Sequence, residues 1–346
     1  MELLKELTES FGVAGFEDEV RELVKNIMKK LCDEVRTDVL GNVIGLKKGA
    51  RKESKRRSVM LCAHIDEIGF LVTHIDDNGF LRLDPVGGVN PKVTLAQRVV
   101  VLGKERLYGV IGSKPIHIMT DEEMKKPIEI KDMFVDVGLP KDKVKELVSI
   151  GDPVAFYQEF IRVGKHFCCK AMDDRVGVYV MLETLKEIKE HKVDVYVVAS
   201  TQEEVGLRGA VTSAFGVDPD IGIALDTTLA CDVPDTPAHQ RVTELGKGVA
   251  IKIKDSSSIS NPQLVRHLKE IAESTKIQYQ LEILPRGGTD AGAIQRTRAG
   301  VPVATLSIPT RYVHSVVECV HEDDLKSAID LLARYIEKAH ERNYTL

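Results

Sequence analysis

Residues 198–207 read VASTQEEVGL, an apolar run that leads into two adjacent carboxylates, Glu203 and Glu204, and then a glycine. This pattern predicts a buried strand that ends at the paired acids. Open α/β sheets keep their active sites at the carboxyl ends of their strands. Because successive side chains on an extended chain point apart, one carboxylate can bind a metal while the other moves protons. An isolated acidic pair more often lies in a solvated loop. The interpretation therefore depends on whether other predicted strands also end at side chains that can bind a metal.

Other apolar runs also lead to side chains that can bind a metal. The runs at 58–63, 167–172, 221–225 and 301–308 are followed by His64, Asp173, Asp226 and His314, respectively. In the sequence His64-Ile65-Asp66, the histidine can bind a metal through one ring nitrogen while Asp66 holds its other N–H. Taken singly, His64 can equally be an ordinary hydrogen-bonded histidine, and Asp173 or Asp174 a helix N-cap.

Together the strand ends supply two imidazoles and three carboxylates: His64, Asp173, Glu204, Asp226 and His314. Such a nitrogen and oxygen donor set suits zinc, cobalt or manganese. One ion would have more ligands than it needs, whereas two ions that share a bridging aspartate would receive three each. Glu203 then remains unligated and can serve as a proton acceptor.

The pattern of apolar and turn residues changes between residues 71 and 162. Short alternating runs are separated there by turn sequences such as Asp-Asn-Gly and Gly-Gly, and no long helical pattern is present. This pattern predicts a small β-barrel or sandwich inserted into an α/β domain. We therefore predict two domains, with residues 1–70 and 163–346 forming the catalytic domain and residues 71–162 the insert.

The amino-acid composition limits which classes of binding partner are expected. Of 346 residues, 48 are Lys or Arg and 53 are Asp or Glu, giving a formal charge of -5 that favours neither nucleic acid nor an anionic membrane as a partner. No apolar run is long enough to span a bilayer, and the first residues lack the apolar core of a signal peptide, so we expect a cytoplasmic protein. The basic stretch at 49–57, GARKESKRR, is predicted to be a surface loop, with nucleic-acid binding as a remote alternative.

The six cysteines are widely spaced and show no Cys-x-x-Cys motif. A structural zinc site or a disulfide framework is therefore not expected. Cys168 and Cys169 are adjacent in an apolar strand-like segment, and we predict that both are buried free thiols.

A glycine-rich loop, RGGTDAG, occupies residues 286–292. Its spacing matches neither a dinucleotide-binding motif nor a P-loop. We predict instead that it forms a pocket wall for the substrate side chain, with contributions from Arg286, Gly287, Gly288, Thr289 and Asp290.

Six motifs in order, HIDEIGF, KAMDDRVG, QEEVGLRG, ALDTT, RGGTDAGAI and IPTRYVHS, resemble the signature of the M42 family of dinuclear metallo-aminopeptidases, the tetrahedral or TET peptidases. The similarity runs nearly end to end and includes the position of the insert. It implies an α/β fold in which a mixed-sheet, three-layer, zinc-peptidase-like catalytic domain carries an inserted small β-barrel for dimerisation.

The resemblance also implies a role for each site residue. Two divalent metal ions, zinc or cobalt, would bind per subunit: His64 and Asp226 would hold one, Glu204 and His314 the other, with Asp173 bridging both. Glu203 would be the general base, Asp66 would hold His64, and Asp174 would be a structural partner.

The implied activity is an aminopeptidase that releases N-terminal residues from peptides with a free N-terminus, using a water activated by the two metals. The implied assembly is a hollow tetrahedral dodecamer built from dimers, which would confine peptide degradation. An N-acyl deacylase or carboxypeptidase on the same scaffold is an alternative, as is a non-catalytic metal-binding scaffold protein. Glu203 argues against the scaffold, because a purely structural site has no use for an unligated acid.

Overall fold

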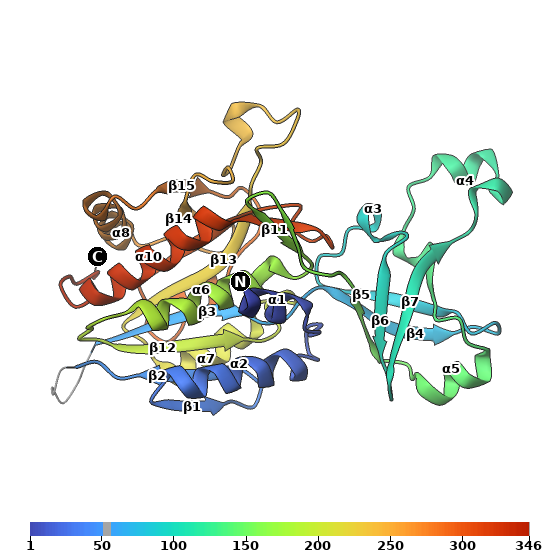
Figure 1. Ribbon diagram of the computed structural model, residues 1–346, viewed down its shortest axis with the longest axis horizontal. Helices are drawn as coiled ribbons and strands as arrows, with labels where there is room; N and C mark the ends of the chain where they lie inside the picture. The colour runs from blue at the N-terminus through green and yellow to red at the C-terminus, as the bar shows by residue number, and fades with distance from the viewer. Residues whose placement is uncertain (51–56, 346) are drawn as a thin grey trace.

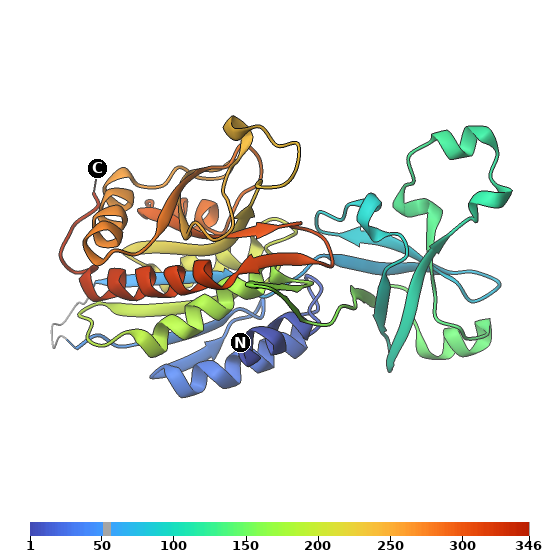
Figure 2. The same ribbon diagram turned by 45° about the horizontal axis from the view of Figure 1, so that its top comes forward.

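The computed structural model describes residues 1–50 and 57–345. The chain forms a large part built on one β-sheet and a smaller β-barrel at one end of the elongated molecule (Figure 1). Figure 2 shows the barrel projecting from the sheet and its helices. Residues 51–56 of the predicted surface loop at 49–57 lie outside the described residues. In the described ranges, no helix has the length and apolar character needed to cross a membrane.

Eleven strands, counted over the described residues, make up one mixed sheet. Its main path runs in the order β1 (Glu34–Thr37), β2 (Val43–Lys47), β12 (Asp194–Ser200), β3 (Ser58–His64), β13 (Ile221–Leu229), β16 (Val303–Arg311), β17 (Glu318–His321), β11 (His166–Cys169) and β10 (Ile161–Val163). Beside this path, β14 (Val249–Lys254) pairs with β16 and with β15 (Tyr279–Ile283). Strands β12, β3, β13 and β16 are parallel neighbours. Two antiparallel pairings turn β11 to the same direction as β16, so all five carboxyl ends face one edge.

Helices cover both faces of the sheet, and strand β3 shows why. Val59, Leu61 and Ala63 enter one apolar layer, whereas Met60 and Cys62 enter the other, as the alternation of side chains along a strand requires. The first layer packs against α1 (Glu2–Glu9), α2 (Asp18–Leu31), α6 (Met172–Glu187), α8 (Pro262–Thr275) and α10 (Glu322–Lys338). The second packs against α7 (Arg208–Val217) and α9 (Ala291–Gln295). The predicted three-layer arrangement is confirmed.

The smaller part is a closed barrel. Its strands follow the order β4 (Gly69–Ile75), β5 (Leu81–Val86), β8 (Met133–Asp136), β7 (Arg106–Ser113), β6 (Arg98–Leu102) and β9 (Pro153–Phe156), and β9 pairs back with β4. Three short helices accompany them: α3 (Pro91–Thr94), α4 (Asp121–Lys125) and α5 (Lys141–Leu147). The interior is apolar, with Phe70, Val99 and Val135 fully buried. The mixed sheet with an inserted barrel confirms the predicted fold class, while the domain boundaries at 71 and 162 remain a prediction.

The cysteine prediction was wrong at one position. Cys168 and Cys319 form a disulfide between β11 and β17, where the two residues are directly opposite each other. Cys169 is a buried free thiol as expected. The sequence could not reveal this pairing, because 151 residues separate the two cysteines and only the pairing of two short strands brings them together.

Candidate metal centre

The side chains predicted at the strand ends lie together at one edge of the sheet. His64 is the last residue of β3, Asp226 lies in β13, and Asp173 is the second residue of α6, which follows β11. Glu203 and Glu204 follow β12, and His314 follows β16. These residues line one cavity of about 480 Å³: His64, Asp173, Glu203, Glu204, Asp226 and His314. Because the contributing strands run in the same direction, their ends converge as the sequence predicted.

Two imidazoles point at one carboxylate. His64 Nε2 lies 3.3 Å from Asp173 Oδ1, and His314 Nε2 lies 3.5 Å from Asp173 Oδ2. The other ring nitrogens face backbone carbonyls: Nδ1 of His64 is 3.1 Å from the Asp66 oxygen, and Nδ1 of His314 is 3.0 Å from the Gly88 oxygen. A carbonyl can only accept, so we infer that the proton of each neutral imidazole is on Nδ1. Each Nε2 of the neutral ring then faces a carboxylate oxygen with its lone pair, an arrangement that a positive charge between the two atoms stabilises, whether a metal ion or a proton on the ring.

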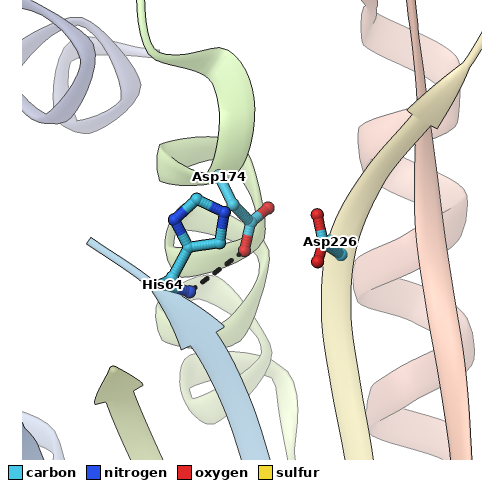
Figure 3. Close-up of side chains that lie close together, drawn as sticks. All are labelled: His64, Asp174 and Asp226. Atoms are coloured by element: carbon cyan, nitrogen blue, oxygen red, sulfur yellow. Dashed lines mark hydrogen bonds between the residues drawn. The ribbon is translucent and has the colours of Figure 1, made fainter. Parts of the chain in front are cut away.

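The remaining candidate ligands complete two sets. Over the described residues, ligand atoms lie within 4.8 Å of one another in two groups: His64, Asp174 and Asp226, and His64, Asp173 and Glu204. His314 joins the second group, because its Nε2 lies 3.2 Å from Glu204 Oε1. Figure 3 shows the first group, with the His64 side chain from β3 and the Asp226 carboxylate from β13 on either side of Asp174. Both groups combine imidazole nitrogen with carboxylate oxygen, which fits a divalent transition metal.

Asp174 is turned toward the protein backbone. Its Oδ2 accepts a hydrogen bond from the backbone N–H of His64 at 3.3 Å (Figure 3). Its Oδ1 accepts one from the backbone N–H of Gly177 at 3.0 Å. The first of these bonds connects the start of α6 to the end of β3. The contacts are compatible with the structural role that the sequence comparison implied, although Asp174 also lies close enough to be a ligand.

Asp66 organises the acidic pair. Its two carboxylate oxygens accept hydrogen bonds from the backbone N–H groups of Glu203 and Glu204, at 2.9 and 3.1 Å. Its Oδ1 is 3.6 Å from Nδ1 of His64, so its backbone carbonyl is the nearer partner of that imidazole. The sequence suggested a contact with His64 but missed the two bonds to the loop after β12. They fix the two glutamates relative to His64.

Charges around the cavity shift several pKa values. Burial raises the pKa of Asp226 well above its ordinary value, and the nearby Asp173 carboxylate adds to the effect. Burial likewise raises the pKa of Glu203, whose carboxylate lies 3.9 Å from Nε2 of His64. For His314, burial acts to lower the pKa, but hydrogen bonds to Asp173 and Glu204 raise it to about 12. The site thus carries an excess of negative charge that attracts cations.

The glycine-rich loop is only partly exposed to the cavity. Arg286, Gly287 and Gly288 line it, and Gly287 has a φ of 94°, which favours glycine. Thr289 and Asp290 are buried behind it. The Asp290 carboxylate accepts hydrogen bonds from Ser200 Oγ at 2.5 Å and from the Cys62 thiol at 3.2 Å. The structure therefore places three of the five predicted residues in the wall and two beneath it.

Sequence reasoning missed several residues of this site. Gly88, which follows barrel strand β5, contributes the carbonyl that holds His314, and a Cβ on Gly88 would lie 2.7 Å from Nδ1 of that histidine. Glu318 accepts hydrogen bonds from the backbone of both Asp173 and His314. The Gly87-Gly88 pair was the available signal for the first, although its composition predicts only a turn.

Comparison with known proteins gives a consistent result. The sequence pattern of the M42 glutamyl aminopeptidase family matches residues 41–331, and a shorter pattern, AMPT, matches residues 1–23. A lysyl aminopeptidase from Pyrococcus furiosus is 39% identical over 351 residues, covering 99% of each chain.

Solved structures agree with the sequence matches. An aminopeptidase from the archaeon Desulfurococcus kamchatkensis is 43% identical, with a TM-score of 0.93, and the match covers 97% of this chain and 94% of that one. The TET1 peptidase of Pyrococcus horikoshii, described as assembling into a tetrahedron or a large octahedral shell, is 34% identical, with a TM-score of 0.85 and coverage of 97% and 98%.

The fold and these matches define a peptidase that has a mixed β-sheet covered by helices and an inserted β-barrel. The pattern match spans most of the sequence and the relatives align nearly end to end. The chain belongs to the M42 peptidase family, and the family and the names of its relatives support an aminopeptidase function.

Proposed function

We propose that the chain is an aminopeptidase that uses two divalent metal ions, zinc or cobalt, to remove N-terminal residues from peptides. The observation that carries this proposal is the pair of imidazole Nε2 atoms directed at the two oxygens of Asp173. Asp173 would be a ligand shared by both ions, His64 and Asp226 would hold one of them, and Glu204 and His314 would hold the other. Two metal ions in such a site lower the pKa of water and polarise the scissile carbonyl.

Glu203 is the proposed general base. Its carboxylate lines the cavity beside His64, and its backbone is held by Asp66. It accepts a proton from the water that attacks the peptide carbonyl, and it then donates that proton to the departing amine. A largely buried carboxylate suits both steps. Burial raises the pKa of Glu203, so this carboxylate holds a proton more readily than an exposed glutamate does before it passes the proton on.

The pocket wall at residues 286–290 is the proposed determinant of substrate preference. Arg286, Gly287 and Gly288 face the cavity together with the apolar side chains of Leu229 and Leu284. Thr289 and Asp290 support the wall from below. Exchanging Arg286 should alter which N-terminal side chain is cleaved fastest, and an unchanged preference would contradict this assignment.

The proposed substrates are peptides with a free N-terminus. The proposed assembly is a tetrahedral dodecamer built from dimers, with residues 71–162 as the dimerisation domain and residues 1–70 and 163–346 as the catalytic domain. The assembly described for the Pyrococcus horikoshii relative supports this proposal. Light scattering after size-exclusion chromatography would test it, and a mass near the 38.3 kDa of one chain would contradict it. A cytoplasmic location remains a prediction.

The experiment that tests the activity is a panel of aminoacyl-p-nitroanilides, each compared with its N-acetylated form. We expect cleavage of the free-amine substrates alone, loss of activity with a chelator, and recovery with zinc or cobalt. Preferential cleavage of acetylated substrates would favour a deacylase, and release of C-terminal residues a carboxypeptidase. Absence of turnover with both metals restored would favour a metal-binding scaffold.

A further inference from the structure

A buried carboxylate outside the proposed ligand set touches two members of that set. Glu318, in β17, is 2% exposed. Its Oε1 accepts a hydrogen bond from the backbone N–H of His314 at 2.7 Å, and its Oε2 accepts one from the backbone N–H of Asp173 at 2.9 Å. Both bonds are made to main-chain atoms, which leaves the side chains of Asp173 and His314 directed into the cavity.

The backbone at both contacted residues is irregular. His314 has a φ of 61°, a left-handed conformation that L-residues other than glycine adopt at a cost. Asp173 has φ and ψ angles of -76° and 106°, which are not helical although it lies in the first turn of α6. The left-handed conformation of His314 persists where its surroundings impose it. Glu318 accepts a hydrogen bond from the backbone of each of these residues.

The strand that carries Glu318 is itself fixed on both sides. β17 pairs with β16 through Val320 and Cys319, and with β11 along its full length, where Glu318 is opposite Cys169. The next residue, Cys319, is joined by the disulfide to Cys168 of β11. Asp173 follows the end of β11 by four residues, so the disulfide connects the strand that carries Glu318 to the strand that precedes one of its two partners.

We propose that Glu318 is a positioning residue that sets the distance between Asp173 and His314, and that the Cys168–Cys319 disulfide keeps its strand in place. The inference rests on the proposed two-metal function, because the two residues are proposed ligands. Its consequence is specific. Loss of the carboxylate should alter the affinity and geometry of metal binding while the sheet and barrel remain folded.

Glu318→Gln is the direct test. The amide keeps the size of the side chain and one acceptor oxygen, but its NH₂ group faces the second backbone N–H, so that bond is lost. We expect cobalt(II) affinity, measured by competition with a chelator, to fall by about 10- to 100-fold, which is the usual effect of removing a residue that orients metal ligands. We also expect the visible absorption spectrum of the bound cobalt to change, because the spectrum reports coordination geometry.

The matched control is Glu322→Gln, which removes a nearby carboxylate that forms a surface ion pair with Arg162. It should bind cobalt as the wild type does. Wild-type affinity and an unchanged spectrum in Glu318→Gln would overturn the proposal. Failure of the wild-type protein itself to bind two cobalt ions would instead contradict the proposed function.

The disulfide provides a second test that leaves Glu318 intact, in case Glu318→Gln does not fold. The double variant Cys168→Ser/Cys319→Ser should bind cobalt more weakly than the wild type and shift the spectrum in the same direction. Treatment of the wild type with a reductant that does not bind metal should reproduce this change. Full retention of affinity and spectrum after loss of the disulfide would overturn the part of the proposal that concerns the strand.

Discussion

The edge of the mixed sheet and the β-barrel bury opposite kinds of side chain. At the sheet edge, carboxylates and imidazoles are taken out of water: His64, Asp66, Asp173, Asp174 and Asp226 are all buried. In the barrel segment 69–156, every residue of which is described, Thr94 is the one buried polar side chain. The barrel instead exposes large apolar residues, with Ile116 and Ile118 more than 60% accessible.

Each arrangement is costly for the isolated chain and indicates a missing partner. Buried charges are unfavourable unless a counter-charge is present, which at the sheet edge we propose to be two metal ions. Exposed apolar side chains near one another mark an interaction surface, which on the barrel we propose to be another subunit. The comparison therefore predicts that changes at the sheet edge affect chemistry, whereas changes in the barrel affect stability and assembly.

The largest effect is expected for Glu203→Gln. The amide cannot accept the proton of the attacking water, so kcat should fall by about 10²- to 10⁴-fold. Stopped and continuous assays with an aminoacyl-p-nitroanilide would measure the loss. Metal content, measured by elemental analysis, should stay the same, because Glu203 is not a proposed ligand.

The control for this variant is Glu187→Gln, at the exposed end of α6. It removes the same charge far from the cavity and should leave kcat unchanged. Near-normal turnover by Glu203→Gln would rule out Glu203 as the base and revive the scaffold interpretation. Loss of metal together with activity would instead assign Glu203 to the ligand set.

Phe70→Ala should produce the opposite outcome. Phe70 is fully buried in the barrel and makes an edge-to-face contact with Phe156 at 5.4 Å between ring centroids. Removal of a buried phenylalanine side chain costs about 3–5 kcal/mol of unfolding free energy, measured by urea denaturation. The folded fraction should bind cobalt normally. Phe215→Ala removes a ring that is 57% exposed and is the matched control, with an expected cost below about 1 kcal/mol.

Sequence patterns located the candidate metal centre because its residues lie at the ends of apolar runs. A run such as 58–63 predicts a buried strand, and parallel strands necessarily bring His64 and Asp226 to the same edge. The barrel could also be predicted from the sequence, because alternating apolar runs and turn residues are local features. The sequence and the implied family signature therefore predict the positions of residues that lie at the ends of parallel strands.

The residues that were missed depend on pairings that no local pattern encodes. Cys168 meets Cys319, and Glu318 reaches the backbone of His314, only because β17 is placed between β16 and β11. Gly88 reaches the site because the start of the insert folds back over it. Contacts between a side chain and a distant main chain leave no periodicity, so they become visible only in three dimensions.

A pH effect on stability is expected from Asp324, a buried carboxylate in the part built on the mixed sheet. Burial raises the pKa of Asp324 from 3.8 to about 6, although hydrogen bonds from Gly246 and Gly248 oppose the shift. The folded chain then binds this proton more tightly than the unfolded chain, so the stabilising contribution is present below pH 3.8 and is lost as the pH rises through about 6. One pKa unit corresponds to about 1.4 kcal/mol, so the loss is roughly 3 kcal/mol.

Asp324→Asn should remove this part of the pH dependence. Urea unfolding of the variant and the wild type between pH 4 and 7 would measure it, and the stability of the wild type relative to the variant should decline across that range. A difference that is constant with pH would show that Asp324 ionises normally in the folded chain.

The smallest effects on stability are expected from two helix caps, one in the part built on the mixed sheet and one in the barrel. Asn261 caps α8 by accepting hydrogen bonds from the backbone of Gln263 and Leu264, and its side chain also donates to the Tyr344 carbonyl at 2.8 Å. Asn261→Ala should lower the unfolding free energy by about 1–2 kcal/mol. Thr120 caps α4, whose five residues are all exposed. Thr120→Ala should change the global unfolding free energy by less than about 0.5 kcal/mol, because α4 can open without the core.

Hydrogen exchange would separate the two caps. In Thr120→Ala, the amides of α4 should exchange faster while those of the barrel strands keep their protection. In Asn261→Ala, faster exchange should extend beyond α8 to the sheet layer on which Leu264 and Leu268 pack. If both variants lost the same global stability, α4 would be part of the cooperative unit, and its exposed apolar neighbours would have to be explained by contacts within the chain rather than by a second subunit.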